Sequence, residues 1–313
     1  MYKYLHNRPV DCIIIRTMVF KNTISNEISL KAYAKINLGL DVTGVMDDGY
    51  HLVKMIMQTV GLYDIVTIRK EEGGKREITL SCTRPDLPCD ESNIAWRAAA
   101  AIMDEYGIKE NVSIYIEKNI PMAAGMAGGS TDGAAVIKGL NELFGLGLSL
   151  EEMDRIAVKI GADVPFCLRT GTYLSEGIGE VLTKLPDVPD ADLLIVNPPI
   201  SVSTAEVYRK LDDTEAPDHP DIDYMIRLLE ENSIRPLAQK MGNILENVTI
   251  KDIGLISQIK EKMMELGAAG SMMTGSGPTV FGLFEDSDKA EDAYAYFSDR
   301  PELGNSFLTV FVR

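Results

Sequence analysis

A glycine-rich loop is the segment whose residue types bear most directly on chemistry. It runs PMAAGMAGGST over residues 121–131, and its glycines and alanines leave the backbone N–H groups with little side-chain cover just before a helical pattern. N–H groups at a helix N-terminus bind phosphate, and the helix dipole adds to the attraction. The loop has neither the Walker A nor the GxGxxG spacing. A phosphate cradle and a tight structural turn are therefore both open interpretations.

Two other segments carry polar groups in apolar surroundings. Residues 273–280, MTGSGPTV, form a second glycine-rich turn with two hydroxyl groups that can face a ligand, although such clusters are often turns only. Lys35 stands between Ala34 and Ile36 and is followed by Asn37. A lysine in such a strand usually points to solvent or lies along the surface. Lys118, just before the first loop, either meets phosphate or covers the surface.

Regular elements flank these segments. Residues 28–43 alternate apolar and polar side chains, as a half-buried strand does, and further strands are expected at 55–69, 76–82 and 112–117. Helices are expected at 94–106 and 132–144. The first glycine loop therefore lies between a strand and a helix.

The second half of the chain alternates helix and strand. Ser149 and Glu152 form a capping box that opens a helix to Ile160, and residues 166–185 are expected to form two strands. The stretch PDVPD at 186–190 marks the most plausible domain boundary, and a smaller α+β layer is expected beyond it.

The composition is that of a globular protein and excludes several classes of partner. The 313 residues are 45 % hydrophobic, and 47 acidic against 31 basic residues give a formal charge of −16. This charge repels phosphate backbones and anionic lipids, so nucleic acid and membrane are not expected partners. The four cysteines lack metal-ligand spacing and are expected to be reduced thiols of a cytoplasmic protein.

Taken in order, these segments resemble the GHMP kinase superfamily of small-molecule kinases. The resemblance extends from about Ile28 to the C-terminus and rests on AKINL (34–38), TG (43–44), DGYH (48–51), QTV (58–60) and GADVPF (161–166). It implies an α+β, two-domain fold, with an N-terminal domain like domain 2 of ribosomal protein S5 and a ferredoxin-like C-terminal domain. The expected parts are an extension of unknown role at 1–24, an ATP-binding domain at 25–185 and a C-terminal domain at 186–313.

The resemblance also implies roles for individual residues. Lys35 and Asp163 match the catalytic pair, in which the aspartate is the general base and the lysine keeps it ionised. Residues 275–278 match a motif that closes the site. Substrate contacts are implied for Asn37, Tyr50, His51 and Tyr208, with a structural role as the alternative for His51. The implied phosphate loop comprises Pro121, Met122, Ala123, Ala124, Gly125, Met126, Ala127, Gly128, Gly129, Ser130 and Thr131.

Alanines are the main departure of this loop from the family pattern. Ala123, Ala124 and Ala127 stand in a loop that is often richer in glycine. Alanine at a position that requires positive φ is strained, because its Cβ crowds the backbone there. We therefore expect any difference in loop geometry to appear at these residues.

The activity that the resemblance implies is phosphoryl transfer from ATP, with Mg²⁺, to the 2-hydroxyl of a cytidine diphosphate-linked methylerythritol in the non-mevalonate route to isoprenoid precursors. Three alternatives stay open: a GHMP kinase for homoserine, mevalonate or a sugar, a ligand sensor on the same scaffold, and a binding protein whose glycine loops are only turns. A nucleotide-base pocket around Tyr50, His51 and Tyr208 argues against the first, and the pair Lys35 and Asp163 against the second. The sequence specifies neither the Mg²⁺ ligands nor the oligomeric state.

Overall fold

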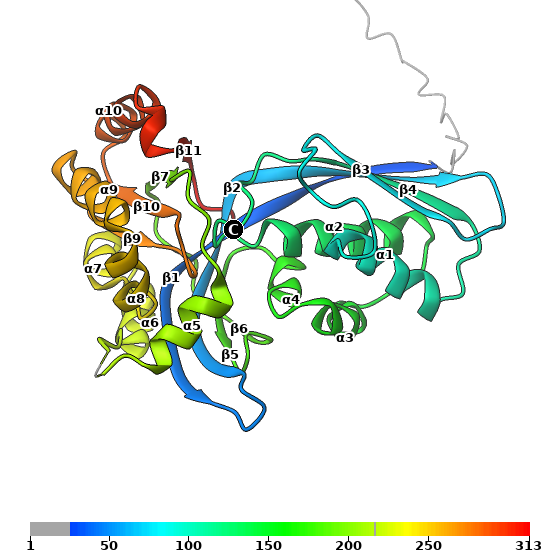
Figure 1. Cartoon of the computed structure of the whole chain (residues 1–313), viewed down its shortest axis with the longest axis horizontal. Helices are drawn as coiled ribbons and strands as arrows, with labels where there is room; N and C mark the ends of the chain where they lie inside the picture. The colour runs from blue at the N-terminus through cyan, green and yellow to red at the C-terminus, as the bar shows by residue number, and fades with distance from the viewer. Residues whose placement is uncertain (1–25, 216) are drawn as a thin grey trace, which may run out of the picture.

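Two lobes share one long antiparallel hairpin. The computed structural model describes residues 26–215 and 217–313, so the extension expected at 1–24 lies outside the described residues. Strands β1 (Glu27–Val45) and β2 (His51–Glu71) run from one lobe into the other (Figure 1). The strand expected at 28–43 is confirmed, and β2 begins earlier than the expected 55–69. Because one hairpin enters both lobes, residues on its middle lie between them.

The first lobe is a sheet with helices on one face. Its strands run in the order β3 (Ile78–Cys82), β4 (Asn111–Glu117), β2, β1, β8 (Gly242–Asn243), and β2 also pairs with β5 (Thr172–Glu176), which pairs with β6 (Val181–Lys184). The helices are α1 (Ile94–Glu105), α2 (Gly128–Leu143), α3 (Leu150–Ile160) and α4 (Val164–Cys167).

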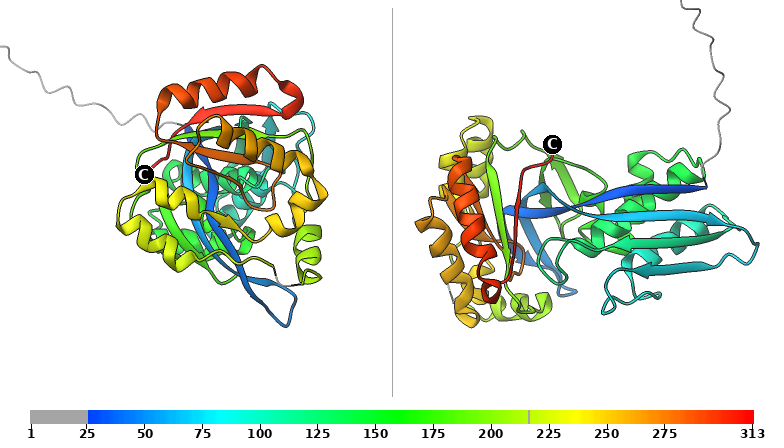
Figure 2. Two further views of the ribbon diagram at one scale, coloured as in Figure 1. Left: turned by 90° about the vertical axis from the view of Figure 1, so that its left-hand side faces the viewer. Right: turned by 90° about the horizontal axis from the view of Figure 1, so that it is seen from above.

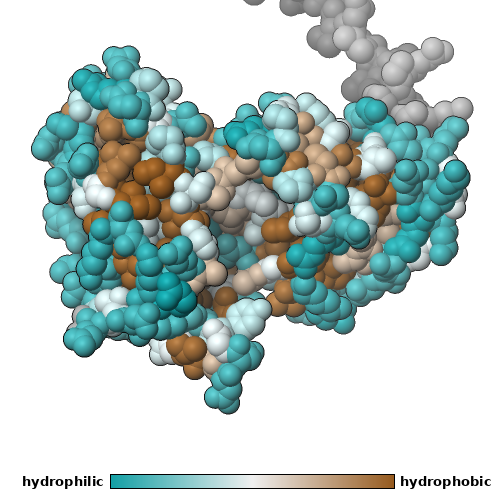
Figure 3. Space-filling view, in the orientation of Figure 1, coloured by the Kyte–Doolittle hydropathy of each residue, from teal (hydrophilic) through white to brown (hydrophobic). Residues whose placement is uncertain are grey.

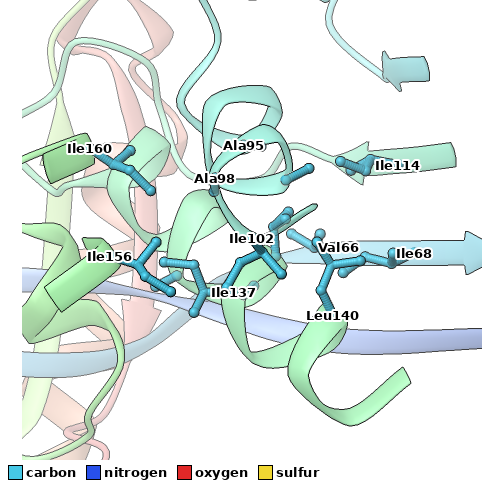
Figure 4. Close-up of a cluster of buried hydrophobic side chains, with 14 of the residues drawn as sticks. Val66, Ile68, Ala95, Ala98, Ile102, Ile114, Ile137, Leu140, Ile156 and Ile160 are labelled. Atoms are coloured by element: carbon cyan, nitrogen blue, oxygen red, sulfur yellow. The ribbon is translucent and has the colours of Figure 1, made fainter. Parts of the chain in front are cut away.

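Aliphatic side chains hold these helices on the sheet (Figure 4). Val66 and Ile68 of β2 pack with Ile102 of α1 and with Ile137 and Leu140 of α2, all fully buried. Alternation along β2 and β4 sends these side chains to the helical face. This core fixes the N-terminus of α2 against the sheet.

Two sequence predictions in this lobe need correction. The prediction of two strands over 166–185 is wrong at its start, because Phe166 and Cys167 belong to α4, which Pro165 opens from within its first turn. Helix α2 begins at Gly128 rather than at 132, so it takes up the end of the glycine loop. The capping box predicted at Ser149 and Glu152 is confirmed.

The second lobe is a four-stranded antiparallel sheet with order β11-β7-β10-β9. Helices α9 and α10 cover its outer face (Figure 2), while β1 and helices α6 and α7 lie toward the other. Alternate side chains of β7 point to the two faces of the sheet. Leu193 and Ile195 pack in the cluster with β1, α6 and α7, and Leu194 and Val196 pack in the cluster with α9 and α10. The α+β class expected from the sequence is thus confirmed. The remaining elements are β7 (Asp192–Asn197), α5 (Thr204–Asp212), α6 (Ile222–Glu230), α7 (Ile234–Lys240), α8 (Glu246–Asp252), α9 (Gly254–Glu265), β9 (Gly270–Met273), β10 (Val280–Phe284), α10 (Ser287–Ser298), η1 (Pro301–Leu303) and β11 (Asn305–Thr309).

The lobes are tied together from both sides. β8 pairs with the middle of β1, and the chain after β11 returns to β2, where Val312 N–H donates to the Thr59 carbonyl. A boundary at 185/186 stays a prediction. Within the described parts of the chain, no helix has the length and apolarity needed to cross a membrane.

Candidate active site

A cavity of about 700 Å³ opens where the two lobes meet. The face shown in Figure 3 is hollowed there. Its wall brings together Lys35 and Asn37 of β1, Asp163 at the start of α4, Tyr208 of α5, and the turn after β9. Most of the first glycine loop adds a further wall. Segments more than two hundred residues apart in the sequence therefore converge on one space.

Lys35 and Asp163 face each other across this cavity. The Lys35 Nζ and Asp163 Oδ2 atoms are 4.0 Å apart, and the lysine side chain is 6 % exposed against 33 % for the aspartate. Lys35 also donates to the Asn37 side-chain oxygen at 2.8 Å. Among the described residues, no donor other than Lys35 approaches the Asp163 carboxylate. A carboxylate held beside a buried cation, with free lone pairs toward the cavity, can accept a proton.

Thr274 connects the two glycine segments to β1. Its hydroxyl accepts from the Asn37 backbone N–H at 3.0 Å and lies 3.4 Å from the Gly125 carbonyl oxygen. Gly275 and Ser276, which follow it, line the cavity. The turn at 273–280 therefore closes the site against the first loop rather than serving only as a turn.

The first loop exposes its backbone at the start of α2. The N-cap is Ala127, which has no side chain able to cap the helix, so the first N–H groups of the helix are left for another acceptor. Gly128, Gly129 and Ser130 supply these groups and line the cavity. An anion placed there would accept several N–H groups at the positive end of a helix dipole.

Two alanines of this loop have left-handed backbone. Ala123 and Ala127 have φ of 50° and 58°, and Gly125 has φ of 70°. Each alanine stores strain of about 1–2 kcal/mol relative to glycine. The loop takes the conformation that glycine would allow, and packing of Ala124 and Met126 in the core below holds it there.

Tyr208, His51 and Asp212 form a cluster at the other end of the cavity. The His51 and Tyr208 ring centroids are 4.7 Å apart, and His51 Nε2 lies 2.8 Å from Asp212 Oδ1. Burial, with the charge of Asp163 adding to it, raises the pKa of Tyr208 to about 12. Tyr208 is therefore a neutral phenol on the cavity wall.

Several predicted site residues lie off the wall. Tyr50 is 60 % exposed in the turn between β1 and β2, and His51 packs against the Tyr208 ring without lining the cavity. Met126 is buried in the core, and Thr131 donates to the Tyr33 carbonyl on the far side of the loop. The other residues of the predicted catalytic pair, phosphate loop and substrate contacts line the cavity, and of the motif at 275–278 Gly275 and Ser276 do so.

Sequence reasoning missed part of the wall. Leu87, Pro88 and Thr204 line the cavity without any motif that marks them. Asn93 caps α1 through its side-chain oxygen and also lines the cavity, which the capping pattern alone does not indicate. Asp132 was indicated only as a helical residue, yet it reaches the wall as well.

Two family models match the chain. The model described as GHMP kinases N terminal domain matches residues 93–171, and the one described as GHMP kinases C terminal matches residues 225–302. The first range includes the glycine loop and Asp163, and the second includes the turn at 273–280.

Curated relatives match nearly full length. A 4-diphosphocytidyl-2-C-methyl-D-erythritol kinase of Clostridium botulinum is 48 % identical over 273 residues, which cover 87 % of this chain and 96 % of the relative. The protein of the same name from Acetivibrio thermocellus is 51 % identical, covering 85 % of this chain and 93 % of the relative.

Solved structures share the fold. A crystal structure of 4-(cytidine 5'-diphospho)-2C-methyl-D-erythritol kinase superposes with a TM-score of 0.76 at 28 % identity, covering 91 % of this chain and all of the other. Homoserine kinase from Cytophaga hutchinsonii has a TM-score of 0.70 at 18 % identity, covering 94 % and 97 %. The second likeness concerns the fold alone.

Proposed function

Because this chain belongs to the 4-diphosphocytidyl-2-C-methyl-D-erythritol kinases within the GHMP kinase family, we propose that its cavity transfers the γ-phosphoryl group of ATP to the 2-hydroxyl of 4-diphosphocytidyl-2-C-methyl-D-erythritol. The chain is a small-molecule kinase. The observation that carries the site assignment is the approach of Lys35 to Asp163 beside an uncapped helix N-terminus. A cytoplasmic location stays a prediction.

In the proposed reaction the first glycine loop binds ATP, and Lys35 and Asp163 act on the acceptor hydroxyl. The backbone N–H groups at the start of α2 bind the ATP phosphates and hold the γ-phosphorus in line with the acceptor. Asp163 accepts the proton of the acceptor hydroxyl as its oxygen forms a bond to the γ-phosphorus, and ADP leaves as the bridging P–O bond breaks. Lys35 stabilises the negative charge that develops on the acceptor oxygen.

Mg²⁺ is proposed to enter with the nucleotide. Among residues 26–215 and 217–313, no group of three histidine, cysteine or acidic side chains is arranged to hold a metal. This fits an ion that takes most of its oxygen ligands from phosphates and water, as Mg²⁺ commonly does. When bound, the ion would neutralise phosphate charge.

The aromatic cluster is proposed to bind the cytidine end of the acceptor. Tyr208 lines the cavity, and His51, held by Asp212, packs against the Tyr208 ring. A homoserine or mevalonate acceptor has no base to stack there. The aromatic cluster and the named relatives therefore favour the nucleotide-linked acceptor over the other GHMP substrates. The close approach of Lys35 to Asp163 favours an enzyme over a ligand sensor.

Replacing Tyr208 by alanine tests this assignment. Loss of base stacking is worth about 1–3 kcal/mol, so KM for the acceptor is expected to rise by about 5- to 150-fold. KM for ATP is expected to stay within about twofold, because the loop is untouched. The measurement is steady-state kinetics with each substrate varied in turn.

The Tyr208→Phe variant is the matched control, since it keeps the ring and removes only the hydroxyl. It is expected to keep KM for the acceptor near the wild-type value. An equal rise in both KM values for Tyr208→Ala would contradict a role in acceptor recognition.

A further inference from the structure

A buried cluster of three charged residues supports the start of α2 from behind. Lys118 Nζ lies 2.7 Å from Asp132 Oδ2 and also donates to Asp64 Oδ2, and the three side chains are 3 %, 3 % and 0 % exposed. Lys118 also approaches the Gly128 carbonyl oxygen at 3.4 Å. Lys118 and Asp132 line the cavity. The cluster therefore joins β2 to the part of the loop assigned to phosphate.

The two carboxyl groups of the cluster are not equivalent. Asp64 accepts from Lys118 on one oxygen and from the backbone N–H groups of Asn119 and Ile120 on the other. Asp132 accepts from Lys118 on Oδ2, whereas its Oδ1 is buried and is the one buried side-chain oxygen or nitrogen without a partner in the described part of the chain. Both oxygens of Asp64 therefore accept hydrogen bonds, whereas only one oxygen of Asp132 does.

This arrangement leaves one negative charge too many if both carboxyl groups ionise. A single lysine balances one of them, and a second charge buried without a partner is expensive, so such a group takes up a proton instead. Both oxygens of Asp64 already accept hydrogen bonds from N–H groups, so a proton on either oxygen would clash with a donor. Asp132 Oδ1 accepts no hydrogen bond, so a proton there meets no donor.

We propose that Asp132 is a neutral carboxylic acid in the working enzyme, and that the Lys118–Asp64–Asp132 cluster, with no net charge, is a positioning unit for the nucleotide phosphates. The inference rests on the proposed function of the loop. An ionised Asp132 would place an uncompensated negative charge behind the surface that receives the triphosphate. A neutral Asp132 holds Lys118, and through it Gly128, without that repulsion.

The electrostatic environment agrees with this protonation. Burial raises the pKa of Asp132 to about 8; Lys118 opposes the shift and Asp64 adds to it. Burial also disfavours the charge of Lys118, but the two carboxyl groups outweigh it and raise the pKa of the lysine, which stays charged.

The other described elements that pack on this turn bring no further balancing charge. Helix α1 presents Ile94 to it, and β1 presents the Tyr33 carbonyl oxygen to Thr131. Helix α4 presents the thiol of Cys167, whose pKa burial raises further above its ordinary value. Of the described residues, the charged groups that act on Asp132 are Lys118 and Asp64.

The proposal fixes the direction of a pH effect. The folded chain holds one more proton than the unfolded chain between about pH 4 and pH 8, so the contribution of Asp132 to folding stability falls as pH rises through that window. Nucleotide binding favours the protonated form. Affinity is therefore expected to fall as pH rises through 8.

Isothermal titration of the full chain with the β,γ-imido analogue of ATP and Mg²⁺ tests this. Wild-type affinity is expected to weaken about fivefold or more between pH 7 and pH 9, with proton uptake of up to about half a proton at pH 8 measured in two buffers of different ionisation enthalpy. Asp132→Asn, which cannot ionise, is expected to show neither effect.

An exposed aspartate provides the control for this test, and infrared spectroscopy provides a second measurement. Asp104→Asn removes an exposed acidic charge from α1 and is expected to keep the wild-type pH response. If Asp132→Asn does not fold, infrared spectra of the wild-type chain replace it: a carboxylic acid C=O band that disappears between pH 7 and pH 9 supports the proposal, and its absence at pH 7 overturns it. An equal pH response in wild type and Asp132→Asn also overturns it, whereas failure of every variant to bind the analogue at pH 7 contradicts the proposed function instead.

Discussion

Replacement of Asp163 by asparagine is expected to lower kcat by about two to four orders of magnitude. General-base catalysis contributes about 10²–10⁴-fold, and Asp163 is the carboxylate that lies 4.0 Å from Lys35 on the cavity wall. Asparagine keeps the shape of the side chain but cannot accept the proton of the acceptor hydroxyl. Nucleotide affinity is expected to change by less than about threefold, because the phosphate loop is intact.

Pre-steady-state kinetics separate these two quantities. Single-turnover rates report the chemical step, and titration with the ATP analogue reports binding. Asp187→Asn, which removes an exposed carboxylate beside Lys184, serves as the charge control and is expected to keep wild-type rates. Single-turnover rates within tenfold of wild type for Asp163→Asn would show that another group takes the proton.

Alanine at Gly125 is expected to lower kcat/KM for ATP by about 100-fold. The Gly125 φ is +70°, and a Cβ built there would overlap the Thr274 carbonyl oxygen, while the Gly275 Cβ position lies 3.0 Å from the Gly125 carbonyl oxygen. The two glycine segments meet backbone to backbone, so an added methyl group must push them apart. A loss of about 2.7 kcal/mol corresponds to that factor. Initial-rate measurements with varied ATP check it.

Gly107→Ala is the matched control for this substitution. Gly107 has φ of +65°, yet a Cβ there meets no atom within 4 Å. Its cost is therefore backbone strain of about 1–2 kcal/mol in folding stability, with kcat/KM for ATP unchanged. Similar catalytic losses in both variants would mean that strain, and not the contact with Thr274, explains the effect at Gly125.

The sequence predicted the individual elements better than the way they meet. Alternation over 28–43 and the capping box at Ser149 depend on neighbours in the chain, and both are confirmed. The contact of Thr274 with Asn37 joins residues 237 positions apart, and no local pattern indicates it. The resemblance placed both segments at one site, although spacing alone could not.

The pairing of buried polar residues leaves little trace in the sequence. Lys118 was expected either to meet phosphate or to cover the surface, but it lies almost fully buried between two carboxyl groups. Asp64 and Asp132 sit inside a strand and a helix, where an isolated acidic residue usually faces solvent. Their pairing depends on tertiary packing, so the sequence offered no signal for it.

The alanines of the loop show how packing overrides a local preference. Ala123 and Ala127 adopt positive φ although glycine would do so without strain. Core contacts of Ala124 and Met126 hold the loop in place between them. The loop therefore keeps left-handed backbone at both alanines and bears the strain.

The most direct test of the account is a competition among acceptors. Purified full-length protein with Mg²⁺ and ATP is incubated with 4-diphosphocytidyl-2-C-methyl-D-erythritol, mevalonate and homoserine together, and phosphorus NMR identifies the product and the oxygen that carries the new phosphate. The account predicts phosphorylation of the cytidine-linked compound at its 2-hydroxyl, with the other two left largely unchanged. Preferential phosphorylation of mevalonate or homoserine would contradict it.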